Sequence, residues 1–197
     1  VDRPPQDKLW AVNVPKQEVV SVILVAAGLG TRLGAGMPKA LVEIAGKPLA
    51  HHALDRILNV PRISEIIVVT PPLDDRLTES LAGYPAKVRV VAGGDSRAAS
   101  VRAGLAVVRR DATRILVHDA ARAFAPAEVF ERVLNQLDQP GCEAVIPARA
   151  VTDTISVVES VPDGDGIQVQ STPARANLRA VQTPQGFHAD ILRAAHA

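Results

Sequence analysis

The stretch from Ala26 to Lys39, "AAGLGTRLGAGMPK", has the composition of a phosphate-binding loop. It opens with Gly28 and Gly30, and the cations Arg32 and Lys39 follow among few other polar side chains. Backbone amides of a glycine-rich loop can approach a polyphosphate, and paired cations stabilise charge building on a phosphorus under attack. We therefore predict that the loop binds a phosphate chain. The alternative is that the glycines only form turns and both cations lie in solvent.

Two familiar phosphate motifs do not match this loop. A dinucleotide fingerprint requires G-x-G-x-x-G, whereas the third glycine here, Gly34, comes one residue too late. A P-loop requires Gly-Lys followed by Ser or Thr, whereas Lys39 follows Pro38 and precedes Ala40. A nicotinamide oxidoreductase is therefore disfavoured.

Two later segments place polar side chains directly after apolar runs. In "VAGGDSRAASVRAGL", Gly94 precedes a predicted helix that is capped by Asp95 or Ser96, and Ser100 lies one turn further on. In "ILVHDAAR", Asp119 ends a strand, where a carboxylate can hold Mg²⁺ bound to phosphate. An ordinary helix cap and a salt-bridging aspartate remain the structural alternatives.

The elements that position these residues alternate regularly along the chain. Continuously apolar strands separated by helices with a 3.6-residue period indicate an α/β fold. We expect a doubly wound, Rossmann-like, mostly parallel sheet with helices on both faces. The predicted strands are 19–26, 65–70, 88–92, 114–119 and 143–148, and the predicted helices are 48–59, 73–82, 96–110, 126–138 and 188–197.

The alternation stops after Ala150. Two β-like runs there flank the turn signal "PDGDG", and no helical period is present. We expect a projecting β-arm over about 150–178, serving as a lid or an oligomer contact, with a plain surface hairpin as the alternative. The domain divisions are thus a loose tail over 1–18 and one domain over 19–197 that carries the arm.

The composition of the chain limits the classes of partner that we expect it to bind. The chain has 22 basic and 21 acidic residues, a net charge of +1, so no broad field attracts nucleic acid or an anionic membrane. The longest apolar stretch, 19–27, is far shorter than a membrane span, and residues 1–18 lack the apolar core of a signal peptide. A single cysteine, Cys142, cannot form an internal disulfide. These features predict a cytoplasmic protein.

Five motifs occur in this order along the chain: "AAGLGTRLGAGMPK", "GGDSRAASVRAGL", "VHDAAR", "DTI" and "TPQGF". Together they resemble the motifs of the 2-C-methyl-D-erythritol 4-phosphate cytidylyltransferase family of the non-mevalonate isoprenoid pathway. The resemblance extends from about Val19 to the C-terminus, and the first motif alone indicates only the wider nucleotidyltransferase superfamily. It implies transfer of a cytidylyl group from CTP to the sugar-alcohol phosphate, with Mg²⁺ and release of pyrophosphate. A ribitol 5-phosphate cytidylyltransferase and a catalytically incomplete CTP-binding homologue are the alternatives.

The resemblance also implies roles for individual residues of the body. Arg32 and Lys39 would hold the triphosphate and stabilise the transition state, and Asp119 would lie near the metal. The implied nucleotide-binding positions are Gly28 and Gly30 of the loop, together with Ala26, Ala27, Gly94, Asp95 and Ser100, which recognise cytosine largely through backbone groups.

For the arm, the resemblance implies a dimer clasp. Thr154 and Arg175 match residues that hold the sugar phosphate, and Arg175 is expected to reach the partner subunit's site. Arg122 and Thr183 are expected to line the same pocket, so that a homodimer shares its active sites.

Four features depart from the family pattern. Val25 and Ala123 stand where many members have proline, and Ala40 replaces a common glutamine. Backbone contacts dominate there, so we expect these changes to be tolerated. Family members also continue past the position of Ala197 with a "TDE" segment and an "NIKVT" strand, which bring a further acidic residue and a lysine to the site.

Overall fold

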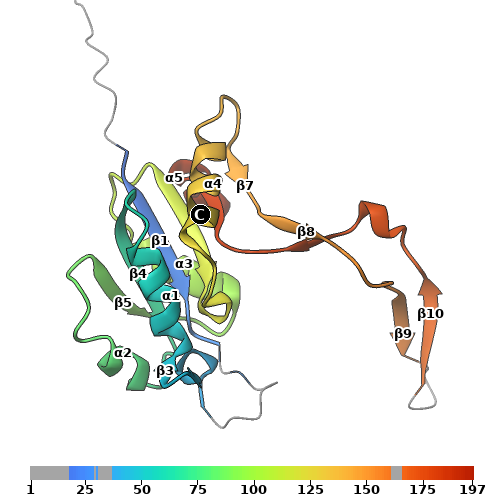
Figure 1. Ribbon diagram of the computed structural model, residues 1–197, viewed down its shortest axis with the longest axis horizontal. Helices are drawn as coiled ribbons and strands as arrows, with labels where there is room; N and C mark the ends of the chain where they lie inside the picture. The colour runs from blue at the N-terminus through green and yellow to red at the C-terminus, as the bar shows by residue number, and fades with distance from the viewer. Residues whose placement is uncertain (1–17, 29, 31–36, 161–165) are drawn as a thin grey trace, which may run out of the picture.

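The computed structural model describes residues 18–28, 30, 37–160 and 166–197. Its central strands are β1 (Val20–Val25), β4 (Ile63–Thr70), β5 (Val88–Ala92), β6 (Arg114–Asp119), β7 (Ala144–Val145) and β12 (Gln185–His188). They form one sheet in the order β5-β4-β1-β6-β12-β7 (Figure 1). β1 is parallel to β4 and β6, β4 is parallel to β5, and β12 is antiparallel to β6 and β7. The predicted mostly parallel sheet is confirmed.

Helices cover both faces of this sheet. The first face carries α1 (Leu49–Leu58), α2 (Arg76–Ser80) and α4 (Ala127–Leu137), whose apolar side chains share one core. The second face carries α3 (Arg97–Val107) and α5 (Ala189–Ala195), which share another. The sheet is therefore doubly wound, as expected.

Strand β1 shows why the sequence folds this way. Its side chains alternate between faces, so Val22 and Leu24 enter the core under α1 and α4 while Ile23 enters the core under α3. All three side chains are fully buried. A strand that is covered on both sides must be apolar throughout, which is the pattern of its sequence.

The chain leaves the sheet as a long β-ribbon. β8 (Ala148–Ala150) pairs antiparallel with β11 (Arg179–Val181), and further out β9 (Val157–Ser160) pairs antiparallel with β10 (Ile167–Ser171). Figure 1 shows this ribbon extending well away from the sheet and its helices. We call residues 148–181 the arm.

Three elements of the main sheet and its covering helices differ most from the sequence-based expectation. The helix expected over 73–82 is confined to α2, because Asp74 accepts hydrogen bonds from the Arg76 backbone and side chain and ends the preceding turn. The strand expected over 143–148 is confined to β7, and Pro147, which has no amide hydrogen, precedes the departure of the arm. β12 was not expected at all.

The described residues also form smaller elements. Beside the sheet these are the short β2–β3 hairpin (Glu43–Ile44 and Lys47–Pro48) and the single-turn 3₁₀ helices Lys39–Leu41 and Ala120–Arg122, and in the arm the 3₁₀ helix Arg175–Asn177. Of the tail predicted over 1–18, residues 1–17 lie outside the described residues. None of the helices in the described part of the chain has the length and apolar character that crossing a membrane requires.

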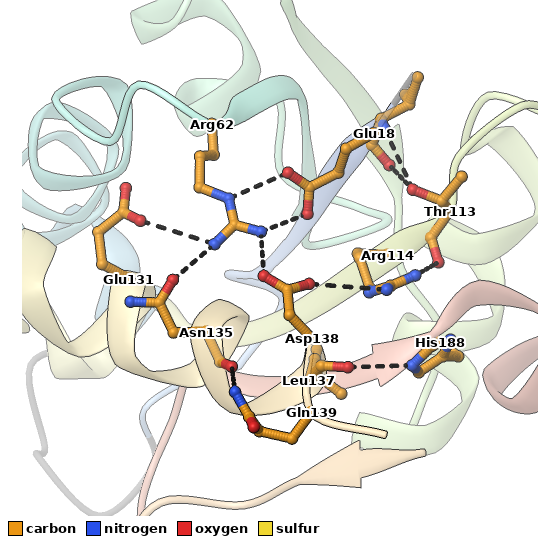
Figure 2. A network of polar contacts seen from close by, with 11 residues as sticks. Glu18, Arg62, Thr113, Arg114, Glu131, Asn135, Leu137, Asp138, Gln139 and His188 are labelled. Carbon is orange, nitrogen blue, oxygen red and sulfur yellow. Dashed lines mark hydrogen bonds and ion pairs between the residues drawn. The ribbon is translucent and has the colours of Figure 1, made fainter. Parts of the chain in front are cut away.

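An arginine cluster joins three elements at the end of the sheet where β1 and β4 begin. Figure 2 shows Arg62 between Glu18, Glu131, Asn135 and Asp138. Its Nε donates to Glu18 Oε2 at 3.0 Å, Nη1 to Asn135 Oδ1 at 2.9 Å and Nη2 to Asp138 Oδ2 at 2.8 Å. The hydrogen bond to Glu18, followed by that to Asp138, raises the pKa of Arg62. This charged cluster fixes the end of α4 onto the sheet.

Replacing Glu65 is expected to destabilise the sheet strongly. Glu65 is 3% exposed, and its carboxylate accepts from Ser21 Oγ at 2.9 Å, Arg89 Nη1 at 2.9 Å and the Arg109 backbone N–H at 3.1 Å. Glu65→Ala leaves the buried Ser21 hydroxyl without this acceptor, so the free energy of unfolding should fall by about 2–3 kcal/mol. Urea denaturation measures the change, with the exposed Glu128→Ala as control; equal effects of the two variants would contradict the assignment.

Candidate active site

A cavity of about 730 Å³ lies at the C-terminal ends of the parallel strands. In a doubly wound fold this edge of the sheet is where ligands bind. The strand register brings the C-terminal ends of three strands together at this cavity, because Val25 at the end of β1 pairs with Val69 in β4 and Asp119 in β6. The loops after β1, β4, β5 and β6 supply its walls, which are Val25, Ala27, Gly28, Gly30, Pro71–Asp74, Gly94–Arg97, Ser100, Asp119 and Ala121.

Gly28 and Gly30 lie against Lys39. The Lys39 backbone N–H donates to Gly28 O at 3.2 Å. Gly30 has a φ of +67°, and a Cβ placed there would lie 2.9 Å from Lys39 Cβ, so glycine is required for this approach. Gly28 and Gly30 both line the cavity, and the structure thus places Lys39 directly beside its wall. Arg32 lies outside the described residues.

The second wall is the turn between β5 and α3. Ser96 caps α3, since its Oγ accepts from the Ala99 backbone N–H at 3.1 Å, so of the two expected caps the structure has Ser96 and not Asp95. The buried Ser100 hydroxyl accepts from Gly94 N–H at 3.2 Å and donates to Gly94 O at 3.4 Å. A Cβ on Gly94 would lie 2.5 Å from Ala99 Cβ. Ser100 therefore holds the Gly94 backbone in place, while the Asp95 side chain is exposed at the cavity.

The remaining nucleotide positions follow β1. The Ala26 backbone N–H donates to Val69 O at 2.9 Å, and Ala26 is buried. Ala27 lines the cavity, and its Cβ lies 2.8 Å from where a Cβ on Gly93 would be. The loops after β1 and β5 are thus in close contact, which explains the glycine at position 93.

Asp119 lies at the cavity with two partners. Its Oδ1 accepts from Arg97 Nε at 3.0 Å, and its backbone N–H donates to Thr183 Oγ1 at 3.2 Å. The Arg97 Nη2 also donates to Gln185 Oε1 at 3.3 Å. Sequence reasoning gave no role to Arg97 or Gln185, although both lie inside quoted motifs, "GGDSRAASVRAGL" and "TPQGF".

Mg²⁺ binding requires oxygen donors at the cavity. The described residues contain no cluster of three or more His, Cys, Asp or Glu side chains that could hold a metal ion. Mg²⁺ at a nucleotide site, however, is commonly bound by one or two carboxylates together with substrate phosphates and water. The Asp119 carboxylate fits that requirement, whereas Asp74 at the other side of the cavity has both its oxygens bonded to Arg76.

His118 is a buried partner of this region that sequence reasoning missed as a site residue. Its side chain is 1% exposed, and Nδ1 lies 2.9 Å from Thr183 Oγ1. The ring packs edge-on against Phe130 at a centroid distance of 5.0 Å. Burial lowers the pKa of His118 to about 4. The apolar residues around His118 in its strand are a sequence signal for a buried, neutral histidine. Its contact with Thr183 has no such signal, because the two residues lie far apart in the sequence.

The pKa of His118 predicts a pH-dependent stability. An unfolded histidine takes up its proton near pH 6.5, whereas folded His118 stays neutral until about pH 4. As the pH falls through this window, the unfolded state binds more protons, so the free energy of unfolding should decrease by up to about 3 kcal/mol.

His118→Asn removes this titration. Denaturation between pH 7 and pH 4 should show a flatter pH dependence for His118→Asn than for the unmodified protein. His196→Gln, at the end of the last helix, is the control and should retain the full slope. Identical slopes for all three proteins would contradict a neutral, buried His118.

A second cavity of about 600 Å³ adjoins the first, since Ala121 lines both. The structure brings Arg122 and Thr183 together here, with Arg132 and Arg149 also on its wall. Arg122 Nη2 donates to Val181 O at 3.1 Å, which attaches it to the base of the arm. The second cavity therefore has a cationic lining beside the first.

Thr154 and Arg175 lie on the arm, away from both cavities. Both are exposed on the arm, and Arg175 Nη1 donates to Thr152 O at 2.7 Å. Within the described ranges neither residue lines the first or the second cavity. A single chain thus does not bring the two predicted arm residues to the predicted site.

Comparison with known proteins identifies the family. Residues 20–197 match the family model for 2-C-methyl-D-erythritol 4-phosphate cytidylyltransferase. Curated 2-C-methyl-D-erythritol 4-phosphate cytidylyltransferases from Rhodococcus jostii and Nocardia farcinica are 45% and 46% identical, over 90% of this chain and 75% and 74% of theirs. The solved 4-diphosphocytidyl-2C-methyl-D-erythritol synthase from Anaerococcus prevotii has a TM-score of 0.74 and 30% identity, covering 91% of this chain and 74% of that one.

These matches confirm the resemblance seen in the motifs and support a nucleotidyltransferase over an oxidoreductase. The chain belongs to the 2-C-methyl-D-erythritol 4-phosphate cytidylyltransferase family of the non-mevalonate pathway.

Proposed function

We propose that the cavity beyond β1, β4 and β6 is the CTP site of this cytidylyltransferase and that the acceptor is 2-C-methyl-D-erythritol 4-phosphate. The observation that carries the proposal is the packing of Gly28 and Gly30 against Lys39 at the wall of a cavity of about 730 Å³. A loop of this kind offers amides and a cation to a triphosphate.

In the proposed reaction a phosphate oxygen of the acceptor attacks the α-phosphorus of CTP in line. The bond from the α-phosphorus to the bridging oxygen breaks, and pyrophosphate leaves with the electron pair. Lys39 and Arg32 counter the charge that develops on the phosphorus oxygens and on the leaving group. Catalysis is thus by position and electrostatics, without a covalent enzyme intermediate.

The base is proposed to lie against the turn between β5 and α3. Ser100 holds the backbone of Gly94 through two hydrogen bonds, so peptide groups there have a fixed orientation. Fixed peptide groups can discriminate donors from acceptors on a base edge without moving. Ala26, Ala27 and Asp95 complete this wall.

Mg²⁺ is proposed to bind through Asp119 together with the nucleotide phosphates. When bound it neutralises phosphate charge and polarises the phosphoryl group. Asp119 lies at the C-terminal end of β6, inside the cavity, and needs no second carboxylate to serve in this way.

The arm is proposed to form a homodimer that completes each site. It exposes the apolar side chains of Ile155, Val157, Val158, Ile167 and Val169, which are 44–69% exposed. Apolar side chains on an isolated ribbon favour burial against a partner. Thr154 and Arg175 of one arm would then bind the acceptor's phosphate in the second cavity of the partner, beside Arg122 and Thr183. A cytoplasmic location without nucleic-acid or membrane partners belongs to the same proposal.

Substrate choice is tested by pyrophosphate release. Each of CTP, UTP, ATP and GTP is combined with either 2-C-methyl-D-erythritol 4-phosphate or ribitol 5-phosphate in the presence of Mg²⁺. We expect release only from CTP with the methylerythritol phosphate. Equal rates with ribitol 5-phosphate, or CTP binding without release from any pair, would contradict the proposal.

A further inference from the structure

Arg97 occupies an unusual place for a surface arginine. It is the first residue of α3, directly after the Ser96 cap, and it lines the first cavity. Its side chain is 48% exposed. A cation at a helix N-terminus is unfavourable with respect to the helix dipole, so a compensating contact is expected.

That contact is a bridge between two strands. Arg97 Nε donates to Asp119 Oδ1 at 3.0 Å, and Nη2 donates to Gln185 Oε1 at 3.3 Å. Asp119 ends β6, and Gln185 begins β12, where it pairs with Val117 of β6. One planar guanidinium therefore joins α3, β6 and β12. A lysine ammonium cannot reproduce this, because it lacks the fixed fork of donors.

The bridge constrains the Asp119 carboxylate. The backbone of Asp119 is already held by Thr183 Oγ1, and Arg97 fixes the side chain through Oδ1. A carboxylate has two oxygens, so the hydrogen bond that Arg97 donates to Oδ1 leaves Oδ2 available to coordinate a metal ion. Groups that orient a ligating side chain in this way strengthen metal binding at many sites.

We propose that Arg97 and Gln185 are positioning residues that orient the Asp119 carboxylate toward the metal-bound nucleotide, an inference that rests on the proposed role of Asp119 in Mg²⁺ binding. Arg97 also places a positive charge beside Asp119. That charge reduces the repulsion between the carboxylate and an incoming triphosphate.

Two simpler roles make different predictions. An exposed ion pair of no consequence would change neither metal nor nucleotide binding when it is removed. An arginine that binds the phosphates directly would matter for CTP even without metal. The positioning role predicts a loss that appears only when metal is present.

Mn²⁺ binding, followed by electron paramagnetic resonance with CTP present, separates these cases without using activity. We expect Arg97→Gln to weaken Mn²⁺ binding about tenfold, and Arg97→Lys not to restore it. Gln185→Met should weaken it in the same direction by a smaller factor. Arg102→Gln, an exposed arginine on the same helix, is the matched control. CTP binding in EDTA should be unchanged in all four variants.

Two results would overturn the proposal. One is that Arg97→Gln changes neither the Mn²⁺ affinity nor the thermal unfolding midpoint. The contact between Arg97 and Asp119 would then be a surface ion pair without a role in metal binding. The other is a loss of CTP affinity in EDTA as large as the loss of Mn²⁺ affinity, which would make Arg97 a direct phosphate ligand. Asp119→Asn distinguishes the underlying assignment. If that variant binds Mn²⁺ normally, the proposed metal site is wrong, whereas weak binding there and normal binding in Arg97→Gln contradicts the positioning role alone.

Discussion

Lys39→Ala is expected to lower kcat by about a hundredfold, with little change in the thermal unfolding midpoint. Removing one preorganised charge donor from a phosphoryl-transfer site costs about 3 kcal/mol of transition-state stabilisation. The Lys39 backbone N–H donates to Gly28 O, and this hydrogen bond does not depend on the side chain, so the contact between Gly28 and Lys39 should survive the substitution. The effect should appear in kcat, because the charge that Lys39 counters grows in the transition state.

Lys87→Ala is the matched control for this variant. Lys87 precedes β5, at the end of the strand away from the cavity, and is partly exposed like Lys39. Steady-state kinetics and thermal unfolding on both variants give the comparison. Near-normal turnover of Lys39→Ala would remove the lysine from the proposed mechanism, and equal losses in both variants would indicate a general effect on folding.

Activity should return when two inactive variants are combined. Lys39→Ala damages the body of a subunit, and Arg175→Ala damages its arm. Loss of a charged hydrogen bond to the acceptor phosphate costs about 2–3 kcal/mol, so Arg175→Ala alone should lower kcat/KM about thirtyfold or more through the KM for the sugar phosphate. Each homodimer is then poor, but a mixed dimer contains one site with an intact body and an intact partner arm.

Random pairing makes about half of the dimers mixed, and half of their sites intact, so co-expression should give about a quarter of wild-type activity. The assay measures product formation at limiting sugar phosphate on all subunits purified together through one shared tag, so that mixed dimers are not enriched. Arg179→Ala on the same arm is the control and should be active alone. If the arm instead serves its own body, the mixture will show no more than the average of the two parents.

The central strands could be predicted from the sequence because burial on both faces leaves a continuous apolar run. The expected strand 88–92 coincides with β5, and 114–119 coincides with β6. β12 could not be predicted in the same way. It is four residues long, and its place between β6 and β7 depends on Gly186, where a Cβ would lie 2.5 Å from Val133 Cγ1 of α4. Such a requirement exists only after the helix and the strand have come together.

The residues of the candidate site likewise include some that the sequence predicts and some that it does not. Lys39 and the glycines could be proposed as site residues from the sequence because cations in a nearly apolar loop are a local pattern, and Asp119 because it ends an apolar strand. The contacts of Asp119 with Arg97 and Thr183 span 22 and 64 positions along the chain, and no periodicity reports them. The role of Thr183 is also broader than the motif suggested, since its hydroxyl contacts both His118 and the Asp119 backbone.

The most direct test of the account follows the α-phosphorus of CTP. CTP radiolabelled at that atom is incubated with the protein, Mg²⁺ and 2-C-methyl-D-erythritol 4-phosphate. The products are separated, the label in each is counted, and each product is identified by mass spectrometry. The account predicts that the label moves into 4-diphosphocytidyl-2-C-methyl-D-erythritol, with one pyrophosphate formed for each label transferred and none without the acceptor. Label that stays in CTP, or becomes attached to the protein, would contradict it.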